Sequence, residues 1–422
     1  MIDTKVLKEN PDAVKEMLLK RNIQFPLDRL LESDRKRRTL ITELQDKYHK
    51  KNLIAKEIAS KKRSNKQTEN ELEEMEQIGT QIKNLEREQR ENEDEYKKLI
   101  YILPNFFHDS VPIGKDERDN KLVNIFKEVT IQPKNHIEMA ETLDLLDLER
   151  AGKIAGARFY FIKNDLVRLS LALTTFAIDF LMKEGYTILQ PPYMIKKEAM
   201  EGAVNLGDFE ETIYKIENED LFMIGTSEHS LASMHMNEIL DGKRLPLKYA
   251  SISPCFRKEA GAHGKDMKGI FRVHQFEKVE QFIFSDPEHS WTEHEKLLKT
   301  TERFYELLDI PFRTIVLSSG DLGKVSAKTY DIEAWFPAQQ AYREICSCSN
   351  CTDYQARRLK IRYRNSPNEE TKLVHTLNST LVAIQRTLVA IMENNQTKRQ
   401  TIKIPQVLQK YMNEQEEIGQ AQ

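Results

Sequence analysis

The segment from Leu30 to Leu99 constrains the fold of this chain more than any other. It contains one glycine, no proline and abundant Lys, Glu, Gln and Arg, a composition typical of long exposed helices. In its second half, positions spaced alternately by four and three residues predict a heptad seam with two polar members. These positions are Ile78, Ile82, Leu85, Gln89, Asn92, Tyr96 and Leu99. The first half has a broken apolar stripe, formed by Leu40, Leu44, Tyr48, Ala55 and Ile58.

A break near Ser64 and Asn65 divides this segment into two halves. The simplest arrangement is two antiparallel helices of about 32 residues, each about 48 Å long at a rise of ~1.5 Å per residue. We therefore predict a coiled-coil arm, about residues 30–99, within an N-terminal domain of residues 1–103. The tip of the arm is flanked by Lys61, Lys62, Arg63 and Lys66. These are either ordinary solvated charges or a contact for a large polyanion.

Pro104 ends the second helix, because proline cannot continue one. The polar residues that follow, with Pro112 and Gly114, predict a linker over residues 104–120. Residues 121–422 are then left for the main domain, in keeping with two or three units for a chain of 422 residues.

Charge and hydropathy limit the classes of function. The chain has 64 Lys and Arg against 67 Asp and Glu, a net charge of −3, so only local patches would attract nucleic acid. The first residues are charged throughout and lack the apolar core of a signal peptide. No apolar run approaches the about 20 residues of a membrane span. We therefore expect a cytoplasmic protein without a membrane anchor.

The four cysteines do not form the framework of a disulfide-rich protein. Cys346, Cys348 and Cys351 lie close together, and Cys255 lies far upstream. A zinc site is possible, but the C-x-C-x2-C spacing lacks the paired C-x2-C of structural zinc sites. Packed thiols on a strand and a turn are the favoured interpretation.

The pattern of the main domain predicts an α+β fold. Residues 166–185 form a predicted helix that leads into the extended run TILQPPYMI, whose Pro191 and Pro192 indicate an edge strand or a bulge. The run is compatible with a contact between subunits or with a simple turn. Beyond Leu221, strand-like runs recur with few helices until an apolar helix over residues 387–393. This favours an antiparallel sheet over a doubly wound one, and no glycine-rich phosphate loop is present.

The run from Phe256 to Glu280 predicts a hairpin that carries chemistry. Alternation places Arg257 and Glu259 on one face of an extended segment, and it gives a shared face on the return strand to Arg272, Phe276 and Glu280. Two cations, two carboxylates and an aromatic ring suit a substrate with phosphate, base and ammonium groups. The loop over residues 260–269 holds three glycines with His263, Lys265 and Lys268, which would make it mobile and attractive to polyanions. The alternative is an ordinary amphipathic hairpin with solvated charges.

Read along its whole length, the chain resembles the seryl-tRNA synthetases, which are class II aminoacyl-tRNA synthetases. The double helix resembles their tRNA-binding arm, TILQPPYMI their first class II motif, the FRKE-to-KVE hairpin the second, and HTLNSTLVAIQRTLVAIMENNQ the third. TSE at residues 226–228 and REICSCSNCTDYQARR resemble segments of the serine-specific family. The resemblance implies a catalytic domain built on an antiparallel sheet with flanking helices.

The resemblance also implies the activity. Serine and ATP would give seryl-adenylate and pyrophosphate, and the seryl group would pass to tRNA(Ser), possibly also to tRNA(Sec). A serine carboxylate is already ionised at pH 7, so the first step needs positioning and charge stabilisation and no general base. Arg257 and Arg386 would be the catalytic residues, bridging carboxylate to α-phosphate and holding the γ-phosphate. Glu259 would meet the adenine amino group, Phe276 would stack on the base, and Arg272 would bind phosphate.

The family's other site positions map onto this chain as follows. The ATP site would also include Val273, Glu344, Ile345, Cys346 and Ser347, with Glu344 and Ser347 as Mg²⁺ ligands, since a hard cation prefers oxygen donors. The serine site would comprise Thr226, Ser227, Glu228, Glu280, Asn378 and Thr380. The tRNA contacts would be Lys61, Lys62, Arg63 and Lys66 at the arm tip with Lys265 and Lys268 in the loop. A homodimer would carry tRNA on the arm of one subunit, with the acceptor end entering the active site of the other.

Three departures mark this chain. Many bacterial members have glycines where it has Ser379, Leu381 and Gln385, and these bulkier residues would either reshape the serine end or reflect the archaeal and eukaryotic form of the motif. TSE replaces TAE, and Cys346 stands where serine is usual. A non-catalytic paralogue would have lost Arg257, Glu259 or Arg386, and ligases that charge a carrier protein lack the arm. A purely structural coiled-coil protein does not account for the rest of the chain.

Overall fold

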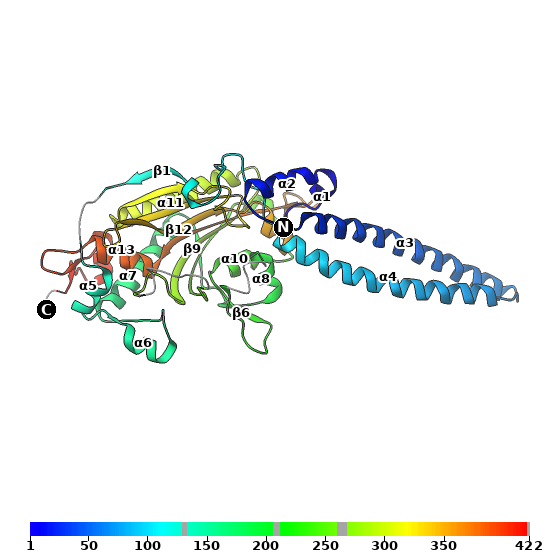
Figure 1. Cartoon of the computed structure of the whole chain (residues 1–422), viewed down its shortest axis with the longest axis horizontal. Coiled ribbons are helices and arrows are strands. Elements are labelled where there is room, and N and C mark those ends of the chain that lie inside the picture. Colours follow the sequence, from blue (N-terminus) through cyan, green and yellow to red (C-terminus); the bar gives the residue numbers. More distant parts are fainter. Residues whose placement is uncertain (129–132, 206–211, 260–267, 420–422) are drawn as a thin grey trace. The chain divides into compact units, whose positions relative to one another are not determined.

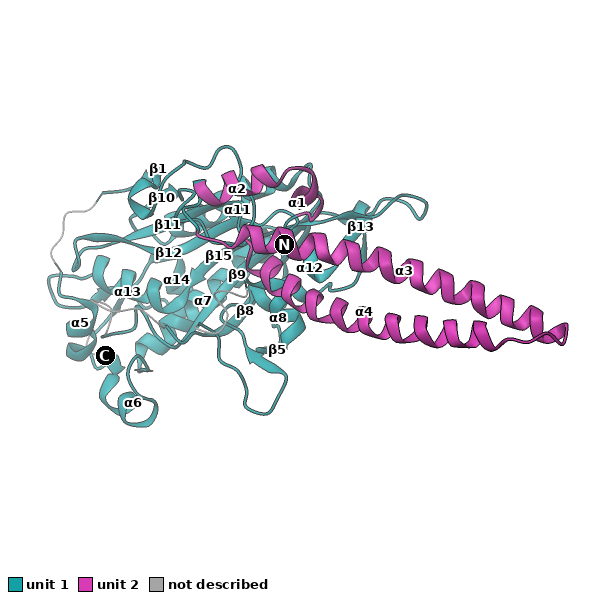
Figure 2. Ribbon diagram, turned by 45° about the vertical axis from the view of Figure 1, so that its right-hand side comes forward, with its two compact units in different colours: residues 1–2, 20–23, 104–422 teal, residues 3–19, 24–103 magenta. Residues whose placement is uncertain are grey.

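The structure is a computed structural model that describes residues 1–128, 133–205, 212–259 and 268–419. Its contacts divide the chain into two compact units (Figure 2). One comprises residues 3–19 and 24–103, and the other comprises residues 1–2, 20–23 and 104–422.

The smaller unit is helical. Its elements are α1 (Lys5–Glu9), α2 (Pro11–Lys20), α3 (Leu27–Arg63) and α4 (Glu69–Ile102). The long pair α3 and α4 confirms the predicted arm, with the turn between them at the predicted break. Asn65 has a positive φ of 49° there, a conformation that asparagine tolerates better than most residues.

The seam of the arm agrees with the prediction in α4 and differs from it in α3. In α4 the apolar members Ile78, Ile82, Tyr96 and Leu99 are buried. In α3 the buried positions are Leu30, Ser33, Asp34, Leu40, Leu44, Ile54 and Ile58. Between Leu44 and Ile54 the heptad passes through half-buried Lys47 and Lys51. The predicted stripe was therefore wrong at Tyr48 and Ala55, which are exposed. Lysine stems cover the seam with methylene groups while their ammonium groups stay in water.

Ion pairs across the arm fix its antiparallel register. They join Arg29 to Glu95, Lys36 to Glu88, Arg37 to Glu93 and Lys50 to Glu74, at 2.5–2.8 Å. Inside the seam, Asn92 Nδ2 donates to the Ser33 carbonyl at 3.0 Å, and Ser33 Oγ donates to Asn92 Oδ1 at 3.3 Å. Exposed pairs stabilise little one by one, so their main effect is to select this alignment of the helices.

The larger unit is built on an 8-stranded sheet with strand order β1-β10-β11-β12-β15-β9-β8-β4 (Figure 1). Every neighbouring pair is antiparallel except β4 with β8. The strands are β1 (Lys121–Phe126), β4 (Thr187–Leu189), β8 (Leu247–Phe256), β9 (Gln275–Ser285), β10 (Phe312–Val316), β11 (Lys328–Phe336), β12 (Ala341–Asn350) and β15 (His375–Ala383). The predicted antiparallel sheet is confirmed.

Short strands and helices complete this unit. The short strands are β2 (Leu146–Asp147), β3 (Phe161–Ile162), β5 (Met194–Lys196), β6 (Leu221–Met223), β7 (Ile239–Asp241), β13 (Arg362–Arg364), β14 (Lys372–Leu373), β16 (Ile402–Lys403) and β17 (Glu417–Ile418). The helices are α5 (His136–Thr142), α6 (Leu148–Ala155), α7 (Asp165–Lys183), α8 (Lys197–Ala203), α10 (Glu228–Ser233), α11 (Ser290–Leu307), α12 (Tyr354–Leu359), α13 (Ile384–Asn394) and α14 (Gln406–Gln409).

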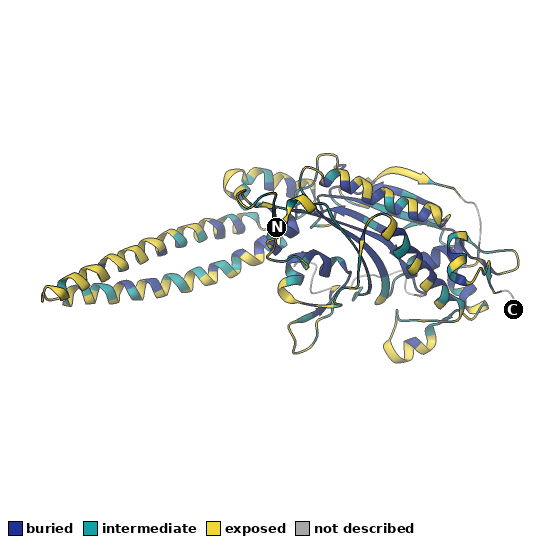
Figure 3. Ribbon diagram, turned by 180° about the vertical axis from the view of Figure 1, so that it is seen from behind, coloured by how far each residue is buried: buried dark blue, intermediate teal, exposed yellow. Residues whose placement is uncertain are grey.

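The two faces of the sheet differ in chemistry. On one, which we call the core face, Val279 and Ile283 of β9 and Leu377 of β15 join a cluster with side chains of α7, α11 and α13. The opposite face is covered at one end by α8, α10 and α12, which cluster with Phe282 and Phe284. The strands between are almost wholly buried, as the dark blue of Figure 3 shows, whereas exposed residues recur along both arm helices.

Pro191 and Pro192 lie between β4 and β5, and β4 is an edge strand. The predicted edge is thus confirmed, since proline lacks the N–H that a central strand would need. Among the described residues, no helix is long and apolar enough to cross a membrane.

Candidate active site

Strand alternation gathers polar side chains on the face opposite the core face, which we call the site face. On β9, Phe276, Lys278 and Glu280 follow one another at every second position. On β15, Thr380 lies opposite Glu280. On β11, Asp331 lies opposite Ser347 of β12. The site face is therefore assembled from strands that are distant in sequence.

A β-bulge aligns two of these groups. Glu344 and Ser347 are three residues apart, so a regular strand would turn them to opposite faces. The register instead pairs Glu344 with Glu333 and Ser347 with Asp331, which leaves Ile345 without a partner. This extra residue brings the carboxylate and the hydroxyl to the same face. It also turns Cys346 to the core face, where its Sγ contacts the Tyr305 hydroxyl at 3.4 Å.

The first cavity, of about 530 Å³, is lined by eight of the predicted site residues. They are Thr226, Glu228, Arg257, Glu280, Glu344, Ser347, Asn378 and Thr380. Lys278 and His229 also line it, although the sequence did not single them out. All the residues that line it belong to the larger unit, so this cavity is a property of that unit alone.

Two carboxylates share one end of this cavity. Lys278 Nζ forms an ion pair with Glu280 Oε2 and donates to Thr380 Oγ1 at 3.2 Å. Thr380 Oγ1 also lies 3.3 Å from Glu280 Oε2. Glu228 has a neutral partner, the amide of Gln355, at 2.9 Å. Burial, together with the charge of Glu280, raises the pKa of Glu228 to about 7.

The cationic side of the cavity is formed by Arg257. Its Nε donates to the Gly225 carbonyl at 3.0 Å, and its guanidinium lies 5.2 Å from the centre of the Phe276 ring. Burial, with the charges of Arg257 and Lys278, lowers the pKa of His229 to about 3, so this imidazole is neutral at pH 7. Its Nδ1 accepts from the Gly225 N–H at 3.3 Å.

A second cavity, of about 690 Å³, shares Glu344 with the first and is rich in arginine. Arg386 Nη1 donates to the Glu344 carbonyl at 2.9 Å and lies 3.3 Å from its carboxylate. The charges of Arg386, Arg257 and Arg272 hold the pKa of Glu344 below its usual value. Phe271 lies against two guanidinium groups, 4.7 Å from that of Arg343 and 5.1 Å from that of Arg386.

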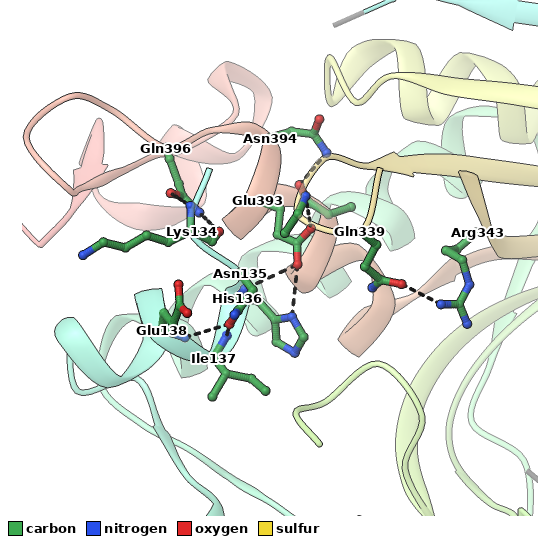
Figure 4. Close-up of polar contacts among 12 residues, drawn as sticks. Lys134, Asn135, His136, Ile137, Glu138, Gln339, Arg343, Glu393, Asn394 and Gln396 are labelled. Carbon is green, nitrogen blue, oxygen red and sulfur yellow. Dashed lines mark hydrogen bonds and ion pairs between the residues drawn. The ribbon is translucent and has the colours of Figure 1, made fainter. Parts of the chain in front are cut away.

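A network of polar contacts extends from Arg343, which lines the second cavity, to Glu393 and His136 (Figure 4). Arg343 Nη1 donates to Gln339 Oε1 at 2.6 Å. The neighbouring Ala338 N–H lies 3.3 Å from Glu393 Oε2, and Glu393 Oε1 lies 3.2 Å from His136 Nδ1. Glu393 belongs to α13, the helix that also carries Arg386. Polar contacts thus connect the turn before β12 to α13, the helix that carries Arg386.

The predicted hairpin is present as the pair β8 and β9, but the alternation argument was wrong for three of its residues. Arg257 and Glu259 lie beyond the end of β8, and Arg272 lies before β9 begins. Glu259 has a positive φ of 48°, which turns the chain out of an extended path. Arg272 Nη1 lies 2.9 Å from Glu259 Oε2, so these two meet through an irregular segment. Arg272 lines the second cavity.

The remaining predicted site residues lie around or outside the cavities. Ser227 is buried and accepts from Ser251 Oγ at 2.7 Å. Val273, Ile345 and Cys346 are buried, the last two in the core cluster, so side-chain contact with a nucleotide is not expected. Lys268 is exposed, and Lys265 lies outside the described residues. At the arm tip, Lys61 pairs with Glu57 and Glu71, while Lys62, Arg63 and Lys66 are exposed.

The three altered positions of the third motif do not enter the first cavity. Ser379 Oγ lies 3.2 Å from Thr301 Oγ1 on the core face, and Leu381 is part of the core cluster. Gln385 forms two hydrogen bonds with Glu277 of β9: it accepts from the backbone N–H at 2.8 Å and donates to the carboxylate. These side chains therefore stabilise the sheet and leave the polar end of the cavity unchanged.

The sequence contained a signal for one of the residues that it did not yield. Lys278 lies between Phe276 and Glu280 at the same period of two, so alternation alone was enough to find it. Asp331 is half-buried, and its buried Oδ1 has no hydrogen-bond partner among the described residues. Its relation to Ser347 depends on pairing between strands, which no local pattern reveals. Gln355 lies on α12, which is distant in sequence from the helix of Glu228.

The cysteines are all unpaired and buried. Burial raises the pKa of Cys255, and it does the same for the three clustered thiols. Over the described ranges, no group of three or more His, Cys, Asp and Glu side chains is arranged to hold a metal ion.

Comparison with known proteins adds to this geometry. Residues 1–107 match the family model of the seryl-tRNA synthetase N-terminal domain, and residues 211–395 match the tRNA synthetase class II core domain (G, H, P, S and T). The serine–tRNA ligase of Nitrosopumilus maritimus is 56% identical over 99% of this chain and 100% of its own. The solved seryl-tRNA synthetase of Pyrococcus horikoshii, complexed with ATP, is 44% identical with a TM-score of 0.91 and full coverage of both chains. The cytoplasmic serine–tRNA ligase of Naegleria fowleri, in complex with AMP, is 36% identical with a TM-score of 0.85, covering 99% of this chain and 98% of its own.

Proposed function

Because the chain belongs to the seryl-tRNA synthetases, we propose that its first cavity binds serine and that the second binds the phosphate tail of ATP. The chain is a ligase: it activates L-serine with ATP to seryl-adenylate and transfers the seryl group to tRNA. The division of the site rests on one observation above all. Glu228, Glu280 and Arg257 line the first cavity, and Arg272, Arg343 and Arg386 line the second, which shares Glu344 with the first.

At the serine end, Glu228 accepts hydrogen bonds from the ammonium group, and Glu280 with Thr380 accepts the hydroxyl. Thr226 and Asn378 line the same cavity and complete its polar wall. An alanine side chain would leave the hydroxyl partners without their substrate contact, which is a strong basis for rejection. Threonine must be rejected by size, because its hydroxyl is the same group.

Activation needs no proton transfer. The serine carboxylate attacks the α-phosphorus, the bond from that phosphorus to the bridging oxygen breaks, and the electron pair leaves with pyrophosphate. Both reacting groups are anionic, so their approach must be stabilised by fixed cations. Arg257 lies between the two cavities' anionic ligands and neutralises both, while Arg386 and Arg272 hold the departing phosphates. Transfer then follows, when a ribose hydroxyl of the tRNA terminus attacks the seryl carbonyl and releases AMP.

The adenine of ATP would stack on Phe276, with its amino group donating to Glu259. In the structure Glu259 is paired with Arg272, so nucleotide binding would replace this ion pair by two substrate contacts. The Glu259 carboxylate would then accept a hydrogen bond from the adenine amino group, and the Arg272 guanidinium would bind a phosphate of ATP.

The oxygen donors near Glu344 fit Mg²⁺. The Glu344 carboxylate is 48% exposed and lines both cavities. Ser347 is beside it on the site face, and the unpaired oxygen of Asp331 lies opposite Ser347. Hard oxygen ligands are those that Mg²⁺ prefers, so Glu344 and Ser347 would hold the ion together with the phosphates. Bound there, Mg²⁺ would neutralise charge on the phosphate tail.

A homodimer is part of this proposal. The edge strand β4 and the exposed apolar residues of α7, among them Leu171 at 63% and Met182 at 60% exposure, are of the kind that subunit contacts cover. In such a dimer, tRNA(Ser) would lie on the arm of one subunit and enter the active site of the other. Size-exclusion chromatography with light scattering tests this point. A cytoplasmic location and tRNA(Sec) as a second acceptor stay predictions from the sequence.

ATP–pyrophosphate exchange tests the activity, since it reports activation alone. Exchange should depend on serine, and equal exchange with threonine or alanine would contradict the assignment of the first cavity.

The arm is tested by replacing residues 41–83 with a short Gly-Ser linker. The ends of this cut face one another by the register of Lys36 with Glu88 and Lys50 with Glu74, and the Asn92–Ser33 contacts remain. Charging of tRNA should be lost while exchange is kept. If charging survived, the tip of the arm would not be a tRNA contact.

A further inference from the structure

Among the described residues that line the first cavity, Lys278 is the one buried cation, and it is paired with Glu280. We propose that it determines amino-acid specificity by holding Glu280 ionised and directed at the serine hydroxyl, so that Glu228 alone receives the ammonium group. The proposal rests on the function given above. It explains how two carboxylates of the same chemistry bind different groups of one substrate.

The position of Lys278 is fixed by the sheet. It lies on β9 two residues before Glu280, and it is opposite Ser253 of β8 and Ala383 of β15. Its side chain is 7% exposed and that of Glu280 is 2% exposed. A buried lysine on a central strand has few rotamers available, so the ion pair with Glu280 and the 3.2 Å hydrogen bond to Thr380 Oγ1 hold it in one direction.

The partners of the two carboxylates differ in charge. Glu280 is paired with an ammonium group, whereas Glu228 receives a hydrogen bond from the neutral amide of Gln355 at 2.9 Å. A buried carboxylate without a cation attracts a cationic ligand most strongly. The ammonium group of the substrate therefore goes to Glu228. A carboxylate that is already paired with a cation can still accept a hydrogen bond from a hydroxyl group. Glu280 therefore accepts the hydrogen bond of the serine hydroxyl.

All the charged and titratable groups around this pair agree with the division. The cavity is lined by Glu228 on α10, Arg257 after β8, Lys278 and Glu280 on β9, and His229, which is neutral. Lys324 and Glu344 also line it, and Glu344 is paired with Arg386. Thr380 and Asn378 face the cavity from β15 without charge. With a bound serine zwitterion, the ammonium faces Glu228, the carboxylate faces Arg257, and Lys278 balances Glu280. Each charge of the bound serine then has one partner, and Lys278 and Glu280 have each other.

Removing Lys278 would make the carboxylates compete. Glu280 would lose its cation and would either take up a proton or attract the ammonium group of the substrate. A protonated Glu280 donates a hydrogen bond, so it no longer selects a hydroxyl that donates. Both outcomes weaken the distinction between serine and alanine, and both leave the ATP contacts untouched.

The experiment compares Lys278→Met with Lys328→Met in the full-length chain. Lys328 is a matched control, because it is also buried on a strand of the sheet, lies 3.5 Å from Glu295 and lines neither cavity. ATP–pyrophosphate exchange is measured against serine, alanine and ATP across pH 6–9. In Lys278→Met we expect the KM for serine to rise about tenfold or more, the preference for serine over alanine to fall about tenfold, and the KM for ATP to stay within about twofold. The acid limb of the serine profile should move to higher pH.

Further variants separate this role from a structural one. Lys278→Arg keeps the charge and should recover part of the serine preference, whereas Lys278→Gln keeps a donor without the charge and should not. If Lys278→Met does not fold, these two variants carry the test by the same ratio of serine to alanine. The proposal is overturned if serine preference and the pH profile match those of the wild type, or if Lys328→Met changes them equally. Absence of serine-dependent exchange in the wild type would instead contradict the proposed function itself.

Discussion

Polar side chains hold both the arm and the site face of the large sheet in place, but their surroundings differ. In the arm the ion pairs are at the surface, and the seam contains one buried amide contact, between Asn92 and Ser33. On the site face, Lys278 and Glu280 are buried on β9, and Arg257 and Glu228 near them are half-buried. Water screens the first set and not the second. Single substitutions should therefore have small effects in the arm and large ones at the site.

The largest effect is expected for Arg257→Ala. This change removes the cation between two anionic substrates, so exchange should fall by about a thousandfold or more while the fold is kept. Exchange at saturating serine and ATP measures it, with circular dichroism as the control for folding. A loss of less than tenfold would mean that Arg257 does not act between carboxylate and phosphate.

Glu344→Gln should reduce exchange by about a hundredfold and raise the Mg²⁺ concentration needed for half-maximal rate. The amide keeps the shape of the side chain but is a poorer ligand for a hard cation. Binding of Mn²⁺ with ATP, followed by electron paramagnetic resonance, reports the same site without catalysis. Unchanged Mn²⁺ affinity would exclude Glu344 as a ligand.

The pH dependence of serine binding should follow Glu228. Its pKa of about 7 in the ligand-free protein means that it is ionised above pH 7 and protonated below. Serine carries a cationic ammonium group throughout this range, so kcat/KM for serine should fall about tenfold for each pH unit below 7. Glu228→Gln should lower kcat/KM and remove this limb. A limb that persists in Glu228→Gln would assign the titration to another group.

The smallest effect is expected in the arm. Asn92→Ala removes the amide contact with Ser33 and should lower the free energy of unfolding by about 1–2 kcal/mol, with no change in exchange. Urea unfolding followed by circular dichroism measures it. If exchange fell as well, the contrast between the two regions would not hold.

The sequence predicted the regular parts of both regions better than the irregular ones. Periodicity located the seam of α4 through Tyr96 and Leu99, but it failed in α3, where Lys47 and Lys51 occupy seam positions. A heptad pattern is recognised by its apolar residues. Lysine breaks that pattern, although its methylene groups can cover apolar surface in the seam. Alternation likewise placed Phe276 and Glu280 on one face, as the structure has them.

Three site residues could not be placed by pattern. Arg257, Glu259 and Arg272 converge through segments outside the strands, with Glu259 at a positive φ. The convergence depends on how the chain turns at the ends of β8 and β9, and it has no periodic signature. Resemblance to the family supplied these residues, while the ion pair of Glu259 with Arg272 became visible only in three dimensions.

The bulge at Ile345 limits which sequence changes in β12 this site can tolerate during evolution. Side chains beyond it face the site or the core according to whether the count of residues along β12 is even or odd. A substitution alters one side chain, but the gain or loss of a single residue in this strand would reverse every position from Ser347 onward. Cys348 would then enter the active site, and the hydroxyl of Ser347 would enter the core. Insertions and deletions within β12 should therefore be far less tolerated than point substitutions at the same positions, and a scan of single-residue deletions would show activity lost along the whole strand.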